Sequence, residues 1–357
     1  MARATIAGVA ALAQVSPQTV SNVLNAPNRV RPATRERVQA AIEHLHFRPH
    51  HAARTLRSRR SRLLGVRLAP PTGDATASLL LDRFLHALTQ EAGDRGYRVL
   101  TFTADGDEQE TQAYDALLSD HDVDAFVLSG THHGDARTAW LVERGVPFVT
   151  FGRPWGEHAQ RHCWVDVDGA AGVRQAVAAL VDAGHRRIGW VGWPSGSGAG
   201  DDRRAGWLGG LHDAGLSPAS PGCGEAAAPD DLGAAGTAVS RLLEDPCPPS
   251  ALVCASDTLA LAAWTRLRRR DAPEPLALVG FDSSPTATAL GFSSVAQPLA
   301  EVAAACLDVL IALLADATTL PPPVLLAPHL VSRAPLPTHP APPTTTPPIP
   351  PIPLGDQ

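Results

Sequence analysis

The sequence has 357 residues and a formal net charge of −6, with 44% hydrophobic and 18% charged residues, which is ordinary for a globular protein of two or three domains. No run of 18 apolar residues exists and the N-terminus lacks a signal-peptide pattern, so we expect a cytoplasmic protein without a membrane span. The five cysteines are scattered without a CxxC pair, which indicates neither a disulfide framework nor a metal site.

The charge is unevenly distributed along the chain. Residues 1–62 contain 11 arginines and two acids, a net charge of +9, whereas the remainder contains 19 arginines and 34 acids, a net charge of −15. A basic block joined to an acidic body indicates a separate polyanion-binding domain.

Four zones are predicted. Residues 1–47 form a head of short helices, and residues 48–62 form a basic connector. Residues 63–334 form a body of alternating strands and helices. Residues 335–357 form a tail in which ten of 23 residues are proline, and we expect this tail to be disordered.

The head has the pattern of a helix-turn-helix. Thr5 is a good N-cap for a helix over Ile6–Ala13, and a turn at residues 14–15 follows. Ser16 caps a second helix that begins with Pro17 and continues through Leu24. The polar side chains that face outward from this second helix are Gln18, Ser21 and Asn22. Inside a basic block, such a helix is expected to enter the major groove of DNA, where amide side chains suit adenine.

These residues carry a resemblance to a known family. The segments Thr5-Ile6-Ala7, Val15-Ser16, Thr19-Val20-Ser21 and Val23-Leu24-Asn25 closely resemble the head of the LacI/GalR transcriptional repressors, as do Thr34–Val38, Phe47-Arg48-Pro49 and Ala52–Arg57. The resemblance implies a DNA-reading head, made by Thr5, Ser16, Pro17, Gln18, Thr19, Ser21, Asn22, Asn25 and Arg29. It further implies that residues 50–58 form a hinge helix that enters the minor groove through His51, Ala53, Arg54, Leu56 and Arg57, with Leu56 as the wedge.

Three positions of the head depart from the family pattern. Gly8 replaces an acid, Arg31 replaces the N-cap serine of the third helix, and Gln14 replaces the turn glycine. If position 14 is left-handed, a glutamine there is expected to cost about 1 kcal/mol.

The body alternates near-continuous apolar strands with amphipathic helices, which predicts an α/β fold with doubly wound parallel sheets. Its length favours two sheets and therefore two lobes. The resemblance makes this a periplasmic-binding-protein-like body, with lobe one at about 63–164 plus 297–322 and lobe two at about 165–296 plus 323–334.

Ligands of open parallel sheets lie beyond the carboxyl ends of the strands. The polar and aromatic residues that follow the predicted strands are Ser129, Thr131, His132, Arg153, Trp193, Ser195, Ser256, Asp257 and Asp282. This set suits a neutral polyol, because carboxylates and arginines bond hydroxyl groups and an aromatic face packs on a sugar ring. The resemblance adds Arg203, Asp282, Trp164 and Gln297 as effector contacts.

The sequence therefore predicts a repressor homodimer that binds double-stranded operator DNA under the control of a small effector, with a sugar favoured. The tail lacks the leucine heptads that would assemble a tetramer. A corepressor-dependent, purine-like regulator and a solute-binding protein remain alternatives. An enzyme is not expected, because residues 195–200 lack a phosphate-binding fingerprint and no catalytic constellation or cofactor motif is present.

Overall fold

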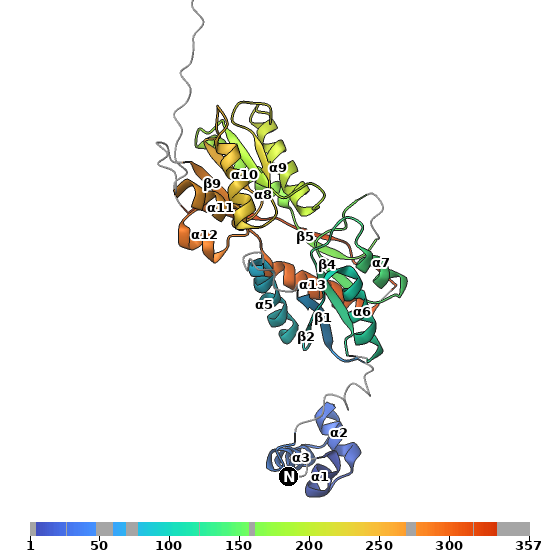
Figure 1. Ribbon diagram of the computed structural model, residues 1–357. Coiled ribbons are helices and arrows are strands. Elements are labelled where there is room, and N and C mark those ends of the chain that lie inside the picture. Colours follow the sequence, from blue (N-terminus) through green and yellow to red (C-terminus); the bar gives the residue numbers. More distant parts are fainter. Residues whose placement is uncertain are drawn as a thin grey trace, which may run out of the picture. The chain divides into compact units, whose positions relative to one another are not determined.

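The computed structural model describes residues 5–25, 27–47, 60–68, 78–120, 122–156, 161–268, 276–316 and 318–333. The chain divides into two compact units, residues 1–62 and residues 63–357 (Figure 1). The hinge helix expected at 50–58 and the proline-rich tail at 335–357 lie outside the described residues. Within the described part, no helix is both long enough and apolar enough to cross a bilayer.

The smaller unit confirms the predicted helix-turn-helix. It contains α1 (Ile6–Ala13), α2 (Pro17–Asn25), the 3-10 turn η1 (Pro27–Arg29) and α3 (Pro32–His44). Its core is formed by side chains from all three α-helices, among them Val9, Val20 and Val38. The spacing of three residues between Val20 and Val23 places both on the buried side of α2, which leaves the opposite side of that helix for polar residues.

Caps define the two helices of the motif. The backbone N–H of Gly8 donates to Thr5 Oγ1 at 3.1 Å, and the N–H of Thr19 donates to Ser16 Oγ at 3.1 Å. Gln14 ends α1 in the left-handed region, with φ 53° and ψ 50°. Arg31 precedes α3 without a side-chain cap. The turn between the helices is therefore left-handed at a position where this chain has a residue other than glycine.

The first sheet of the larger unit is parallel throughout, in the order β11-β5-β4-β3-β1-β2. Its strands are β1 (Leu63–Leu68), β2 (Arg98–Thr103), β3 (Ala125–Ser129), β4 (Phe148–Phe151), β5 (Trp164–Val167) and β11 (Val324–Leu326). Helices α5 (Ser78–Asp94) and α13 (Leu299–Ala315) pack on one face, and α6 (Gly106–Ser119) and α7 (Ala136–Glu143) pack with the other. Successive residues of β3 point to opposite faces of the sheet: Val127 lies in the core beneath α5 and α13, and Phe126 lies in the core beneath α6 and α7.

The second sheet has the order β12-β10-β9-β8-β6-β7. Its strands are β6 (Ile188–Gly192), β7 (Glu225–Ala227), β8 (Ala251–Cys254), β9 (Ala277–Phe281), β10 (Ser293–Ala296) and β12 (His329–Val331). The helices of this lobe are α8 (Gly169–Asp182), α9 (Ala199–Asp213), α10 (Leu232–Leu243), α11 (Asp257–Arg268) and α12 (Pro285–Leu290). Among the described strands of this sheet, the edge strand β12 alone runs antiparallel, to β10, so the predicted parallel, doubly wound fold is confirmed.

Two of the expected lobe boundaries differ from the strand pairing. The sequence predicts them at 164/165 and 322/323, but β5 and β11 pair with each other inside the first sheet, through Val324 opposite Val165. The chain therefore leaves the first sheet after Val167 and again after Leu326. An apolar strand has the same pattern in either sheet, so its partner could not be identified from periodicity.

Candidate effector cleft and DNA-reading surface

The larger unit contains a cleft of about 530 Å³ that residues from both lobes line. The first lobe contributes the start of α5 and the loops that follow β3 and β4. The second lobe contributes the loops that follow β6, β7, β8 and β9. The lining includes Leu79, Leu80, Leu81, Arg83, Ser129, Thr131, His132, Phe151, Trp155, Asp166, Trp193, Ser197, Arg203, Asp230, Asp257, Thr258, Asp282, Ser284 and Gln297. The cleft thus lies at the carboxyl ends of the strands, where the parallel topology predicts it.

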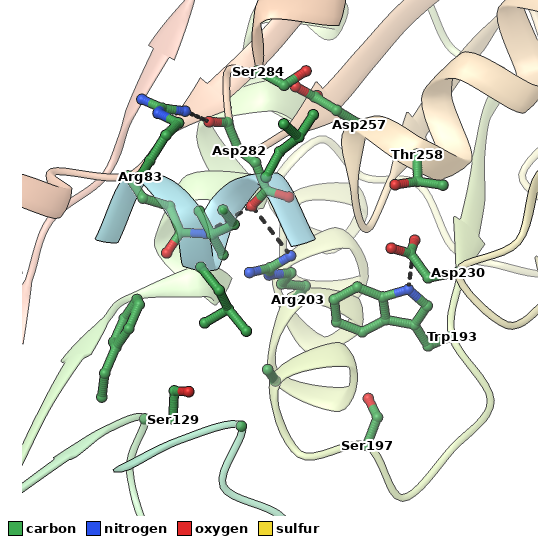
Figure 2. Close-up of a pocket in the computed structure, with 18 of the residues that line it drawn as sticks. Arg83, Ser129, Trp193, Ser197, Arg203, Asp230, Asp257, Thr258, Asp282 and Ser284 are labelled. Atoms are coloured by element: carbon green, nitrogen blue, oxygen red, sulfur yellow. Dashed lines mark hydrogen bonds and ion pairs between the residues drawn. The ribbon is translucent and has the colours of Figure 1, made fainter. Parts of the chain in front are cut away.

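Arg203 and Asp282 face each other in this cleft (Figure 2). Helix α9 carries Arg203, whose Nη1 donates to the carbonyl of Ala255 at 2.5 Å and lies 3.9 Å from Asp282 Oδ1. The guanidinium carbon lies 3.8 Å from the centroid of the Phe281 ring. Gln297 Nε2 donates to Asp282 Oδ1 at 2.7 Å. The arginine is therefore held by a carbonyl and an aromatic face, and the carboxyl group by an amide.

The Asp282 carboxyl group has a perturbed protonation equilibrium. Burial raises its pKa, and the nearby carboxylates of Asp257 and Asp230 raise it further, whereas Arg203 and Gln297 oppose the rise, so that the pKa lies at about 7. Asp282 also has a positive φ of 108°, and Ser283 one of 47°. Backbone strain of this kind in non-glycine residues is concentrated at functional sites.

Trp193 provides an aromatic wall of the second lobe. Its Nε1 donates to Asp230 Oδ1 at 3.2 Å (Figure 2). Ser256 Oγ donates to the same oxygen at 2.5 Å. Ser256 therefore braces Asp230 and is absent from the described lining of the cleft. Asp230 was not predicted from the sequence, because the preceding strand β7 is only three residues long and carries the polar Glu225, so no apolar run signals it.

Asp257 lines the cleft, but both of its oxygens are engaged by protein groups. Oδ1 accepts a hydrogen bond from Ser294 Oγ at 2.6 Å, and Oδ2 accepts one from the backbone N–H of Ser284 at 2.6 Å. Burial raises its pKa, and these bonds oppose the rise. Asp257 thus ties α11 to the segments around β9 and β10.

Trp155 provides a second aromatic wall, from the first lobe. Its Nε1 donates to Thr131 Oγ1 at 3.2 Å. Its indole packs against Gly198 of the second lobe so closely that a Cβ atom there would lie 2.6 Å from ring carbons. Trp155 was not predicted from the sequence. Arg83 and the leucines of α5 were not predicted either, because α5 begins ten residues after the end of the preceding strand β1.

Arg153 and Trp164, two further predicted effector contacts, are absent from the described lining of the cleft. Arg153 Nε donates to Asp166 Oδ2 at 2.7 Å, and its Nη2 lies 3.5 Å from Asp202 Oδ2 on α9. Arg153 therefore joins the two lobes. Trp164 begins β5 as a partly buried residue. The position of Arg153 after a strand end predicted a ligand contact, but its guanidinium instead forms ion pairs with aspartates of the protein itself.

The polar side of α2 carries most of the predicted DNA-reading residues of the head. Gln18 is exposed, and its Nε2 donates to Asn22 Oδ1 at 3.0 Å. Ser16 Oγ and Thr19 Oγ1 lie 2.9 Å apart. The other positions in the described part are Thr5, Pro17 and Arg29, which are exposed, and Ser21, which is partly buried. The side chain of Asn25 and all of His51, Ala53, Arg54, Leu56 and Arg57 lie outside the described part of the chain.

Family models match both units of the chain. Residues 5–50 match the family described as bacterial regulatory proteins, lacI family, and residues 177–335 match the periplasmic binding protein-like domain. The HTH-type transcriptional regulator CelR of Thermobifida fusca is 32% identical over 335 residues, which covers 93% of this chain and 98% of that protein. The HTH-type transcriptional repressor PurR of Escherichia coli is 26% identical, covering 78% of this chain and 81% of that protein.

Solved structures agree with these matches. The structure of a transcriptional regulator CelR–cellobiose complex aligns with a TM-score of 0.67 and 29% identity, covering 93% of this chain and 99% of that one. The lac repressor dimer bound to operator and the anti-inducer ONPF aligns with a TM-score of 0.78 at 23% identity, covering 94% and 100%, which shows a common fold. The relatives are regulators of transcription and not enzymes. The helix-turn-helix head, the two-lobed body and this likeness over nearly the full chain identify the protein as a member of the LacI family of DNA-binding transcriptional regulators.

Proposed function

We propose that this regulator is a homodimeric repressor whose affinity for operator DNA is controlled by a neutral sugar bound between the two lobes. The observation that carries the proposal is the arrangement of Arg203, Asp282 and Trp193 around one cleft. A carboxylate and a guanidinium can bond adjacent hydroxyl groups of one sugar ring, while an indole packs on its apolar face. The cellobiose of the CelR complex supports a sugar as the ligand class.

The charges of the cleft favour an uncharged ligand. Its described lining includes four aspartates (Asp166, Asp230, Asp257 and Asp282) but only two arginines (Arg83 and Arg203). The Nη1 atom of Arg203 donates to Ala255 and lies near Asp282, so part of the charge of Arg203 is already compensated. A phosphate group would therefore meet more carboxylates than free cations, and its desolvation would be poorly compensated. Oδ2 of Asp230 and Oδ2 of Asp282 are suited to accept hydrogen bonds from the hydroxyl groups of a sugar.

The head would read DNA through α2. Gln18 and Asn22 lie on the polar side of this helix, where amide groups can bond adenine in the major groove. Two heads of a dimer would recognise two half-sites about one helical turn apart. The dimeric, operator-bound state of the lac repressor structure supports this assembly. Residues 50–58 would then enter the minor groove between the half-sites, with Leu56 as the wedge.

A purine-like corepressor is a second candidate, favoured by the similarity to PurR. The indoles of Trp155 and Trp193 could also stack on a nucleobase. The two candidate ligands would change operator affinity in opposite directions: a corepressor would raise it and an inducing sugar would lower it.

The test is selection of the purified full-length protein on randomised duplex DNA at near-physiological salt, repeated with a sugar panel and with purines. We expect a palindromic consensus whose binding is released by a neutral sugar. Enrichment only in the presence of a purine would establish the corepressor alternative. Failure to enrich any sequence under every condition would refute operator recognition by this head.

A further inference from the structure

Arg83 joins the first lobe to the strained turn that carries Asp282. It projects from α5 of the first lobe, and its Nη1 donates to the carbonyl of Asp282 at 2.9 Å (Figure 2). The same Nη1 donates to the carbonyl of Ser283 at 3.2 Å. Both acceptors belong to the second lobe, directly after β9. Hydrogen bonds of these lengths exist only while α5 and the turn stay close together.

The turn has an unusual backbone that presents these two carbonyls. Asp282 and Ser283 have φ values of 108° and 47°. The second lobe holds the turn through the N–H of Asp282 on the carbonyl of Val295 at 2.8 Å and through Arg333 Nη2 on Ser283 Oγ at 2.6 Å. The turn is therefore a fixed part of the second lobe, and Arg83 contacts it from outside that lobe.

Asp282 consequently takes part in two different interactions. Its carboxyl group faces Arg203 and the cleft, whereas its backbone carbonyl accepts from Arg83. Helix α5 also lines the cleft with Leu79, Leu80 and Leu81. A ligand that engages the carboxyl group thus acts on the same residue whose backbone carbonyl is bonded to Arg83 of α5. A ligand can shift a conformational equilibrium only through contacts that differ between the two states, and the bonds of Arg83 can persist only in a state that keeps α5 beside the turn.

We propose that Arg83 is the residue that couples occupancy of the Asp282 carboxyl group to the relative position of the lobes. This inference rests on the proposed function, because it assigns a regulatory role at the same cleft. Arg83 is a positioning residue: it lines the cleft, but the two hydrogen bonds described above go to the backbone of the turn. Without Arg83, a sugar that saturates the cleft would no longer change the position of α5 or the DNA affinity of the protein.

The test compares wild type with Arg83→Ala, Arg83→Lys and Arg174→Ala. Arg174 is a matched control, because it is an exposed helical arginine that pairs with Asp213 at 3.5 Å within one lobe. The first measurement needs no ligand: amide hydrogen exchange of the full-length protein, followed at residues 280–284. We expect faster exchange in Arg83→Ala, a smaller change in Arg83→Lys and none in Arg174→Ala. Unchanged exchange at these residues in Arg83→Ala would overturn the contact itself.

The second measurement tests how strongly sugar binding changes operator affinity in each variant. Each variant is titrated onto the duplex obtained by selection, with and without the panel sugar that gives wild type its largest rise in melting temperature. The sugar is added at concentrations that saturate each variant. We expect wild type and Arg174→Ala to change operator affinity by about tenfold or more on adding sugar, and Arg83→Ala by less than about twofold. Arg83→Lys should recover part of the response.

Two outcomes of this titration would overturn the inference. A full response in Arg83→Ala would show that the contact is a surface contact without a role in coupling. Loss of sugar binding in Arg83→Ala would show that Arg83 builds the binding site instead. If no sugar in the panel binds wild type, the proposed function fails, and hydrogen exchange still decides whether Arg83 holds the turn.

Discussion

Arg203 and Asp282 lie 3.9 Å apart, yet the pKa of the carboxyl group is raised to about 7 instead of being lowered by its cationic neighbour. The first reason is burial, which disfavours the charged carboxylate. The second is that the carboxylates of Asp257 and Asp230 raise the pKa further, so the attraction of Arg203 offsets only part of the rise. The protonated and charged forms of Asp282 are therefore both populated near neutral pH, beside Arg203 in the cleft.

Asp282→Asn should stabilise the ligand-free protein at high pH. A carboxyl group whose folded pKa is raised from 3.8 to about 7 destabilises the folded state fully above pH 7, and this penalty fades as the pH falls from 7 towards 4. We expect the variant to melt roughly 2–6 °C higher than wild type at pH 8 and to lose most of this gain at pH 5. The exposed carboxylate of Asp213 provides the control, and Asp213→Asn should leave the melting temperature unchanged at both values. A variant that is less stable than wild type at pH 8 would contradict the burial penalty.

Sugar affinity should rise with pH. Hydroxyl groups donate to a carboxylate, so binding favours the charged form of Asp282, and the affinity should increase about tenfold between pH 6 and pH 8 before it levels off. Isothermal titration at several pH values measures this profile. His132 also lines the cleft; burial lowers its pKa, but bonds to the carbonyl of His133 and to Asp107 raise it overall. A His132→Gln variant that keeps the profile, beside an Asp282→Asn variant that loses it, would assign the titration to Asp282.

Gly198→Ala should disturb the contact between the lobes. Gly198 has φ +62°, and an added Cβ would lie 2.6 Å from the Trp155 indole, whereas Gly196 has φ +93° and no atom within 4 Å of such a Cβ. Gly196→Ala therefore suffers only backbone strain of about 1 kcal/mol, while Gly198→Ala suffers strain and a clash. We expect Gly198→Ala to weaken sugar binding more than tenfold, and Gly196→Ala to change it less than threefold. Equal effects of the two variants in calorimetry would show that the Trp155 contact has no influence on sugar binding.

Gln14→Gly should stabilise the head. Gln14 ends α1 with φ 53° and ψ 50°, a conformation that costs a residue with a side chain roughly 1 kcal/mol. We expect slower amide exchange of α1 and α2 in the full-length variant, by about fivefold. Gln39 lies exposed inside α3, and there the same change to glycine should instead speed exchange, because glycine disfavours a helix interior.

Leu56→Ala tests the minor-groove wedge that the family resemblance implies. Unstacking of the central base step is compensated by contacts on bent DNA, so loss of the wedge should reduce affinity for the selected operator well over tenfold. Sugar affinity should remain that of wild type, because residue 56 belongs to a different unit from the cleft. An operator affinity equal to that of wild type in a gel-shift titration would dismiss the wedge.

Local sequence signals were sufficient for the helix-turn-helix of the head and for the more apolar strands of the body. Thr5, Ser16 and Pro17 determine where α1 and α2 begin, because caps and a first-turn proline act within one helical turn. Apolar runs predicted β1 to β4 of the first sheet and β6, β8 and β9 of the second, but not β5, β7, β10, β11 or β12. The position after a strand end led to Trp193 and Asp282 in the cleft. These signals are short-range, so a single sequence contains them.

Only the tertiary structure decided which side chains meet across the lobes. Arg153 follows a strand like the other candidates, but its guanidinium forms ion pairs with Asp166 and Asp202. Arg83 lies in an ordinary helical pattern 199 residues before Asp282, and no periodicity connects the two. The order of the strands, including the pairing of β5 with β11, likewise depends on long-range packing. Contacts of this kind arise when separate elements bury their apolar faces together, which the pattern within any one element does not specify.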